Sequence, residues 1–283
     1  GKDRVMATYR ARVRARNHVA AFIKSFYRRS DMSMLELTPD FIKEFAAYLS
    51  TEAGLRNGSI WANCMWLKGV VMKAHYNGLI PRNPFIQFHI SPNVKEREYL
   101  TEDELKAVMT HEFADSKLAY IRDIFIFASF TALSFVDIQE LTNDNIVEVN
   151  GEKWILSKRH KTKVAFQVKL LDIPLQIVER YRPMQKDNRI FPGLNYWSIC
   201  KPLKRMIREC GITKSISFHC SRHGFATLAL SKGMPIESVS RVLGHTNIVT
   251  TQLYAKITTQ KLDNDLTMFG DKLSKTFNGI TMS

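Results

Sequence analysis

The stretch His219-Cys-Ser-Arg-His-Gly-Phe-Ala-Thr227, followed by Leu243-Gly-His245 and by Tyr254, is the densest group of chemically versatile side chains in this sequence. On a helix, His219 and Arg222 are three positions apart and therefore share a face. The glycine before His245 predicts a turn between two helices. The stretch thus predicts a helical region with basic, imidazole and phenol groups near one another in the chain.

These residue types suit phosphoryl transfer. A phosphodiester under attack passes through a five-coordinate state with negative charge on its non-bridging oxygens. Arginine forks and imidazole N–H groups neutralise such charge without a metal. A tyrosine hydroxyl beside them can act as the nucleophile and store the bond energy as a phosphotyrosine.

The charge of the chain indicates an anionic partner, for which double-stranded DNA is the usual candidate. The net charge is +14 over 283 residues, and residues 1–97 carry +9 of it. Arg10, Arg12, Arg14 and Arg16 are predicted to contact phosphates, with a plain solvated helix face as the alternative. No apolar run approaches the ~18 residues that a membrane span needs, so no membrane partner is expected.

A metal site is not expected. The four cysteines, Cys64, Cys200, Cys210 and Cys220, form no CxxC pair, and their spacing matches no zinc motif. His219 and His223 with Cys220 lack a third ligand at a suitable spacing. Reduced thiols in a cytoplasmic protein are the simpler interpretation.

The first part of the chain is predicted to be a small helical domain, residues 1–90. Helices are expected over 4–28, from Thr38 to Gly54, and from Ser59 to Asn77. Thr38 is a suitable N-cap and Pro39 suits the first helical position. Val5, Val13, Phe22, Ile23, Phe26 and Tyr27 are expected to share the apolar face of the first helix. Residues 91–98 are predicted to be a linker, because prolines and polar residues replace the helical pattern.

Residues 99–283 are predicted to be a second domain, mainly helical with a small antiparallel sheet. Residues 101–104 form a capping box before an apolar helix at about 118–132. Asn150-Gly151 predicts a hairpin, and 165–173 alternates like a strand. Further helices are expected at about 174–182, 196–210, 220–231, 235–243 and 247–257, with a last one in the tail after about 258.

Taken together, HxxR…LGH…Y resembles the tyrosine recombinase (phage integrase) family, and is similar to integrases of conjugative and mobilisable transposons. The match runs from Thr101 to Ala255, and the preceding helical domain fits the family's core-binding domain. The resemblance implies that Tyr254 attacks the scissile phosphate and that Arg222 holds its non-bridging oxygens. It assigns His219 and His245 to proton transfer and phosphate binding.

The resemblance also implies a lysine on the sheet hairpin that protonates the leaving 5′-oxygen. Lys161 fits this role. Lys158 and Lys163 are the alternatives and are otherwise expected to bind DNA. His223 is expected to support the site.

One position departs from the family pattern. An arginine is expected where the chain has Ser134, three residues before Asp137, which fits the acidic support. Serine cannot replace a bidentate guanidinium. Three explanations stay open: Arg122 supplies the charge, Ser134 binds the phosphate and leaves the charge to Arg222 and Lys161, or the enzyme is impaired.

The resemblance implies a site-specific recombinase or integrase of a mobile element, acting in the bacterial cytoplasm at the nucleoid. A homo-tetramer on paired DNA sites is expected, with possible DNA-bending accessory proteins and without metal or other cofactor. The tail after about 258 is expected to dock on a neighbouring subunit or to pack within its own chain. Because the chain starts with Gly1, an arm-type DNA-binding domain is expected upstream. The alternatives are a type IB topoisomerase-like enzyme and a non-catalytic DNA-binding relative.

Overall fold

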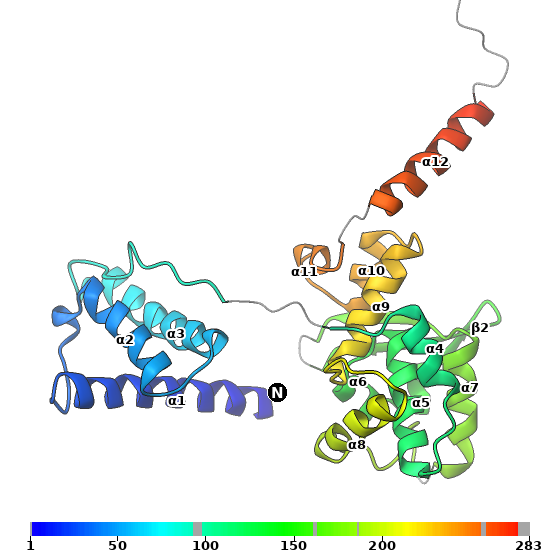
Figure 1. Cartoon of the computed structure of the whole chain (residues 1–283), viewed down its shortest axis with the longest axis horizontal. Coiled ribbons are helices and arrows are strands. Elements are labelled where there is room, and N and C mark those ends of the chain that lie inside the picture. The colour runs from blue at the N-terminus through cyan, green and yellow to red at the C-terminus, as the bar shows by residue number, and fades with distance from the viewer. Residues whose placement is uncertain (1, 93–97, 161–162, 186, 256–258, 277–283) are drawn as a thin grey trace, which may run out of the picture. The chain divides into compact units, whose positions relative to one another are not determined.

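The computed structural model describes residues 2–92, 98–160, 163–185, 187–255 and 259–276. The chain divides into two compact units, Gly1–Glu96 and Arg97–Ser283 (Figure 1). Each unit has a hydrophobic core of its own. In the part of the chain that the structure describes, no helix is both long and apolar enough to cross a bilayer.

The first unit is all helical, with α1 (Lys2–Phe26), the 3-10 turn η1 (Met34–Glu36), α2 (Pro39–Thr51) and α3 (Asn57–Tyr76). Thr38 caps α2, since its hydroxyl accepts a hydrogen bond from the Phe41 amide at 3.2 Å, and Pro39 opens the helix. Buried Phe22, Phe41 and Phe45 form the centre of the core.

Only the C-terminal part of α1 packs into this core. Phe22 and Ile23 are buried, but Phe26 is 56% exposed, so its place on the apolar face was predicted wrongly. Arg10, Arg12, Arg14 and Arg16 are all exposed along α1. The helix therefore carries a basic surface over a stretch that contributes little to the core.

The second unit joins helices to one small sheet. Its elements are α4 (Glu102–Thr110), α5 (Ser116–Thr131), α6 (Phe135–Gln139), η2 (Asn143–Asn145), β1 (Ile146–Val149), β2 (Glu152–Lys158), β3 (Ala165–Lys169), α7 (Asp172–Tyr181), η3 (Arg182–Met184), α8 (Tyr196–Glu209), α9 (His219–Ser231), α10 (Ile236–Leu243), α11 (Val249–Gln252) and α12 (Thr259–Thr276). Helix α5 is buried along most of its length, and α7, α8 and α9 pack against it. The mainly helical fold with a small antiparallel sheet is confirmed.

The sheet is antiparallel in the order β1-β2-β3. Asn150 and Gly151 form the predicted hairpin turn, with φ of 53° and 76°, and Val149 pairs with Glu152 across it. Strand β3 ends at Lys169 rather than at 173. Pro174 has no amide hydrogen for a ladder but fits the first turn of a helix, so α7 begins at Asp172.

The helix predicted over 247–257 is much shorter within the described residues. Helix α11 spans only Val249–Gln252, and Tyr254 follows it in a turn. The Tyr254 amide donates to the Thr251 carbonyl, an i to i−3 bond that tightens the chain. Two β-branched residues, Ile248 and Val249, precede this turn and disfavour a long helix.

The residues that follow α11 pack against a small apolar cluster. Ala226 and Leu230 of α9 pack with Val239 and Leu243 of α10, and Tyr254 packs against them. The tyrosine ring is therefore fixed by the same two helices that carry the HxxR and LGH residues.

Candidate active site

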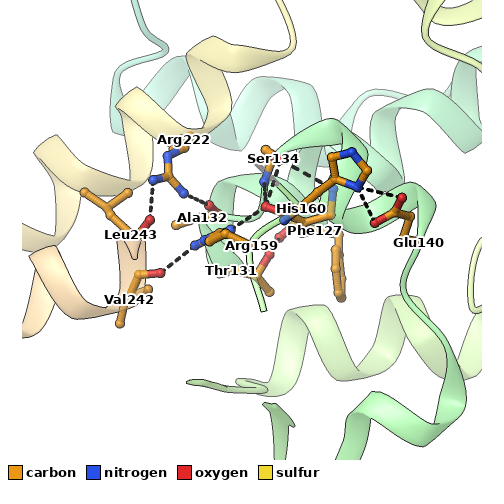
Figure 2. A network of polar contacts seen from close by, with 11 residues as sticks. Phe127, Thr131, Ala132, Ser134, Glu140, Arg159, His160, Arg222, Val242 and Leu243 are labelled. Carbon is orange, nitrogen blue, oxygen red and sulfur yellow. Dashed lines mark hydrogen bonds and ion pairs between the residues drawn. The ribbon is translucent and has the colours of Figure 1, made fainter. Parts of the chain in front are cut away.

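Two buried arginines are anchored to successive carbonyls at the end of α10 (Figure 2). Arg222 of α9 donates to the Leu243 carbonyl and, at 2.7 Å, to the Ala132 carbonyl. Arg159, which directly follows β2, donates to the Val242 carbonyl at 2.6 Å. The last carbonyls of a helix have no partner within the helix and carry partial negative charge, so they suit two cations.

Gly244 makes this close approach possible. It ends α10 in the left-handed region, with φ of 61°. A Cβ at this position would lie 2.9 Å from Nε and 3.0 Å from Cγ of Arg159. The glycine of the LGH segment is therefore required both by the backbone turn and by the arginine packed on it.

Asp137 holds Arg159 from the other side. Its Oδ2 accepts from the Arg159 guanidinium at 2.7 Å and from the Ser134 hydroxyl at 2.8 Å, and its Oδ1 accepts from the His160 amide at 3.0 Å. Burial opposes ionisation of Asp137, but the His160 amide and the Arg159 charge outweigh it and lower its pKa. The carboxylate therefore stays charged and keeps Arg159 in place.

The Ser134 side chain stabilises the start of α6. It is the N-cap of α6, where its hydroxyl and Asp137 form a reciprocal capping box. Its side chain thus already binds Asp137, and the guanidinium that reaches this carboxylate comes from Arg159.

The guanidinium groups of Arg159 and Arg222 are both buried. Burial, and then the positive charge of Arg159, lower the pKa of Arg222 to about 10. Burial also lowers the pKa of Arg159. Its Nε is buried and has no hydrogen-bond partner among the described residues. An anion bound beside the two guanidiniums would relieve their mutual repulsion.

Tyr254 lies between two imidazole rings. Its ring centre is 4.9 Å from that of His223, edge to face, and 6.5 Å from that of His245, nearly parallel. His219 stands 5.0 Å from His223 in turn. The negative charge that Tyr254 can carry partly offsets the lowering of the Arg222 pKa, as expected for a phenol near the guanidinium.

His245 is held in its neutral form. Burial and then the charge of Arg222 lower its pKa to about 4. Its Nδ1 lies 2.9 Å from the Thr251 hydroxyl. When Thr251 donates to Nδ1, the neutral ring presents its Nε2–H to a ligand. The ring is thereby suited to hydrogen-bond a phosphate oxygen.

The structure brings together Tyr254, Arg222, His219, His245 and His223. It does not bring Arg122 to them. The Arg122 guanidinium donates to Asp123 at 2.8 Å and to the His111 carbonyl at 2.8 Å. It also lies about ten residues, or ~15 Å of helix, before Ala132 on α5.

Lys161 lies outside the described residues. Lys158 is exposed at the end of β2, and the Lys163 amide donates to the Arg159 carbonyl at 2.8 Å. Both alternatives thus flank the turn that follows Arg159.

Arg159 is the site residue that the sequence reasoning missed. Strand alternation contains a signal for it, because Ile155 and Arg159 share a side-chain parity opposite to that of exposed Leu156 and Lys158. An arginine on the buried face of a strand needs a carboxylate partner, and Asp137 was already singled out.

Comparisons with known proteins show the family and the fold of the chain. Residues 98–261 match the model of the phage integrase family, and residues 1–90 match the phage integrase SAM-like domain. Tyrosine recombinase XerA of Pyrococcus horikoshii is 32% identical over 177 residues, which cover 58% of this chain and 58% of that protein. Tyrosine recombinase XerC of Lactobacillus leichmannii is 25% identical over 229 residues, covering 76% and 77%.

Solved structures share the fold. The integrase of transposon Tn1549, in complex with circular intermediate DNA, superposes with a TM-score of 0.71 at 17% identity, covering 84% of this chain and 87% of that one. A lambda integrase dimer bound to a core site gives 0.65 at 18% identity, covering 83% and 86%.

Proposed function

The chain belongs to the phage integrase family, and from this membership we propose that it is a site-specific DNA recombinase that cuts and rejoins DNA through Tyr254. The observation that supports this most directly is the phenol of Tyr254 packed between imidazoles beside two buried guanidiniums. The Tyr254 oxygen attacks the scissile phosphorus, the bond to the 5′-oxygen breaks, and a 3′-phosphotyrosine forms. The reverse attack by a 5′-hydroxyl releases the enzyme, so no energy source is consumed.

Arg222 and Arg159 bind the non-bridging oxygens of the phosphate. Each keeps N–H groups beyond those that the carbonyls and Asp137 accept, because a guanidinium has five donors. In a dry site such preorganised donors stabilise developing charge strongly. We therefore assign to Arg159, in place of Arg122, the charge that is missing at Ser134.

His219 and His245 donate to the phosphate or pass protons around it. His223 supports the tyrosine ring. The proton for the leaving 5′-oxygen comes from Lys161, with Lys158 or Lys163 as the alternatives. Phosphate stabilisation by side-chain cations leaves no step that requires a metal or another cofactor.

Duplex DNA is the partner of both units. In the first unit, α1 carries four exposed arginines, Arg10, Arg12, Arg14 and Arg16. When they bind DNA phosphates, the counterions condensed on the DNA are released, and this release favours binding. The proposed assembly is a homo-tetramer on two DNA sites, with DNA-bending accessory proteins as further partners, acting at the bacterial nucleoid.

Integration and excision of a mobile element is the proposed task. The Tn1549 integrase with circular intermediate DNA and a XerH recombinase bound to its difH site share this fold. The chain spans 58% of the length of the XerA relative. A topoisomerase is not favoured, since the matched relatives are recombinases. The main argument for a non-catalytic relative is the arginine that is missing at position 134, and in this proposal Arg159 supplies that charge.

A covalent-trapping experiment tests the proposal. The protein is incubated with a nicked duplex that carries the end of the element encoding it, in EDTA, and separated on a denaturing gel. We expect a protein–DNA adduct at Tyr254 that Tyr254→Phe abolishes while DNA binding stays intact. An adduct that persists in Tyr254→Phe, or the lack of one in the parent protein bound to its site, would overturn the proposal.

A further inference from the structure

The first turn of helix α8 carries the most exposed large apolar side chain in the part of the chain that the structure describes. Trp197 is 83% exposed, and its amide is capped by the Asn195 side chain at 2.9 Å, so the backbone beneath it is fixed. A single exposed apolar residue is common on protein surfaces. The surroundings of Trp197 give it a specific meaning.

Two lysines continue the same face of α8. Trp197, Lys201 and Lys204 follow one another at spacings of four and three residues, opposite the buried face of Ile199, Leu203, Met206 and Ile207. Both lysines are exposed, and neither is ion-paired with a carboxylate of the described residues. Their neighbour Arg205 differs, because it is paired with Glu209 at 2.7 Å. We call Trp197, Lys201 and Lys204 the α8 stripe.

Aromatic contacts place the α8 stripe beside the active site. Trp197 packs edge to face on Tyr196 at 5.9 Å, and Tyr196 packs in the same way on Phe135 at 5.4 Å. Phe135 in turn contacts Phe218 at 5.3 Å. Phe135 directly follows Ser134, and Phe218 directly precedes His219. Packed rings therefore connect the start of α8 to the two segments that carry Ser134 and His219.

We propose that the α8 stripe reads the base sequence next to the scissile phosphate, with the Trp197 ring against the C5-methyl group of a thymine in the major groove. This inference rests on the proposed function, because it requires a duplex held at the active site. A helix fits the major groove, and the thymine methyl is the apolar mark that groove displays. Lys201 and Lys204, about one and two turns further along the same face, neutralise neighbouring phosphates and fix the register without reading sequence.

Deoxyuridine scanning tests the contact. Each thymine of the bound duplex is replaced in turn by deoxyuridine, which removes only the methyl group, and affinities are measured with the Tyr254→Phe protein to prevent cleavage. We expect one position near the scissile phosphate to weaken binding about fourfold, the effect of one buried methyl group. In a background that also carries Trp197→Ala, the same replacement should have no effect.

Met184→Ala is the matched control, because Met184 is also an exposed apolar side chain of the second unit, at 61%. It should leave the deoxyuridine profile unchanged. Equal profiles in Trp197→Ala and the parent protein would overturn the contact with thymine.

Salt dependence tests the lysines. Replacing Lys201 and Lys204 by glutamine should lower the slope of log affinity against log salt by about 1.8, the loss of two phosphate contacts. An unchanged slope would remove the lysines from the DNA surface.

The adduct experiment separates this inference from the proposed function. A parent protein that forms the Tyr254 adduct while Trp197→Ala keeps the thymine preference refutes the α8 stripe alone. If the parent protein forms no adduct, the recombinase proposal itself fails.

Discussion

Two regions of the second unit each surround a buried carboxylate with two arginines, yet their electrostatics differ. At α5 and α7, Asp123 accepts from Arg122 at 2.8 Å, from Arg180 at 2.7 Å and from the Tyr181 hydroxyl at 2.7 Å. At the end of α10, Arg159 is the one arginine of the described residues that donates to Asp137, and Arg222 is held by neutral carbonyls. Both regions contain the same number of charges, but only the first places both cations on the anion.

The pKa directions express the difference. Hydrogen bonding to Asp123 raises the pKa of Arg180, whose side chain is 55% exposed. Burial lowers the pKa of both Arg159 and Arg222. The first region is a satisfied structural cluster. In the second region, burial destabilises the charged form of both guanidiniums, and a bound anion would remove this cost. A count of arginines does not separate the two cases, whereas their partners do.

Replacing Arg159 of the second region and Arg122 of the first by alanine, in separate variants, tests this contrast most strongly. Arg159→Ala should slow DNA cleavage by at least about 100-fold, the effect of losing one preorganised charge-stabilising donor. Arg122→Ala should leave cleavage by the folded protein near normal and cost about 1–3 kcal/mol of unfolding free energy, because Asp123 keeps two partners. Single-turnover cleavage and chemical denaturation measure the two effects. The reverse pattern would return the missing charge to Arg122.

Moving the guanidinium across Asp137 sharpens the comparison. The Ser134 hydroxyl is 2.8 Å from the same carboxylate oxygen that holds Arg159. Adding Ser134→Arg to Arg159→Ala should therefore recover about tenfold in cleavage rate, equivalent to one restored charged hydrogen bond. The same single-turnover assay measures it. No recovery in a double variant that still binds DNA would show that Asp137 does not define the site.

A methyl group at Gly244 should disturb only the second region. Gly244→Ala forces a left-handed residue and pushes on the buried Arg159, at about 1–2 kcal/mol of stability. Cleavage should fall by about tenfold, since small misplacements of a phosphate ligand are costly. Gly233→Ala is a suitable control, because it also has positive φ, at 89°, but nothing lies within 4 Å of its Cβ position. If the two variants cleave equally well, Arg159 does not depend on Gly244.

The smallest effect concerns pH. The pKa of His245 is about 4 in the folded chain against 6.5 for a free imidazole, so the unfolded chain binds more protons between these values. Stability should consequently fall as pH drops from about 6.5 towards 4. His245→Gln should flatten this part of the curve, which urea denaturation at a series of pH values measures. A His245→Gln protein with an unchanged acid slope would contradict the buried neutral ring.

The sequence predicted most of the fold, and it grouped most of the candidate site residues that lie together in the structure, for reasons that are local. Thr38-Pro39, the Thr101–Glu104 box and Asn150-Gly151 each act through their nearest neighbours in the chain. His219 and Arg222 share a helix, so their spacing was sufficient to pair them.

Arg159 was not predicted as a site residue, because the groups that it contacts are distant in the sequence. It meets Asp137, 22 residues earlier, and Val242, 83 residues later. The boundary between β3 and α7 and the shortness of α11 were predicted wrongly for a related reason, because alternation and helical periodicity give similar patterns over a few residues. Such features depend on tertiary packing, which periodicity does not contain.

The capping box of Ser134 and Asp137 has a consequence for recognising similar chains. One carboxylate can receive its guanidinium from the start of a helix or from the end of a strand, since both come within 3 Å of the same oxygen. A motif search that scores only position 134 would discard this chain, although a buried guanidinium, that of Arg159, reaches Asp137. A search that asks which arginine reaches Asp137 in space would keep it.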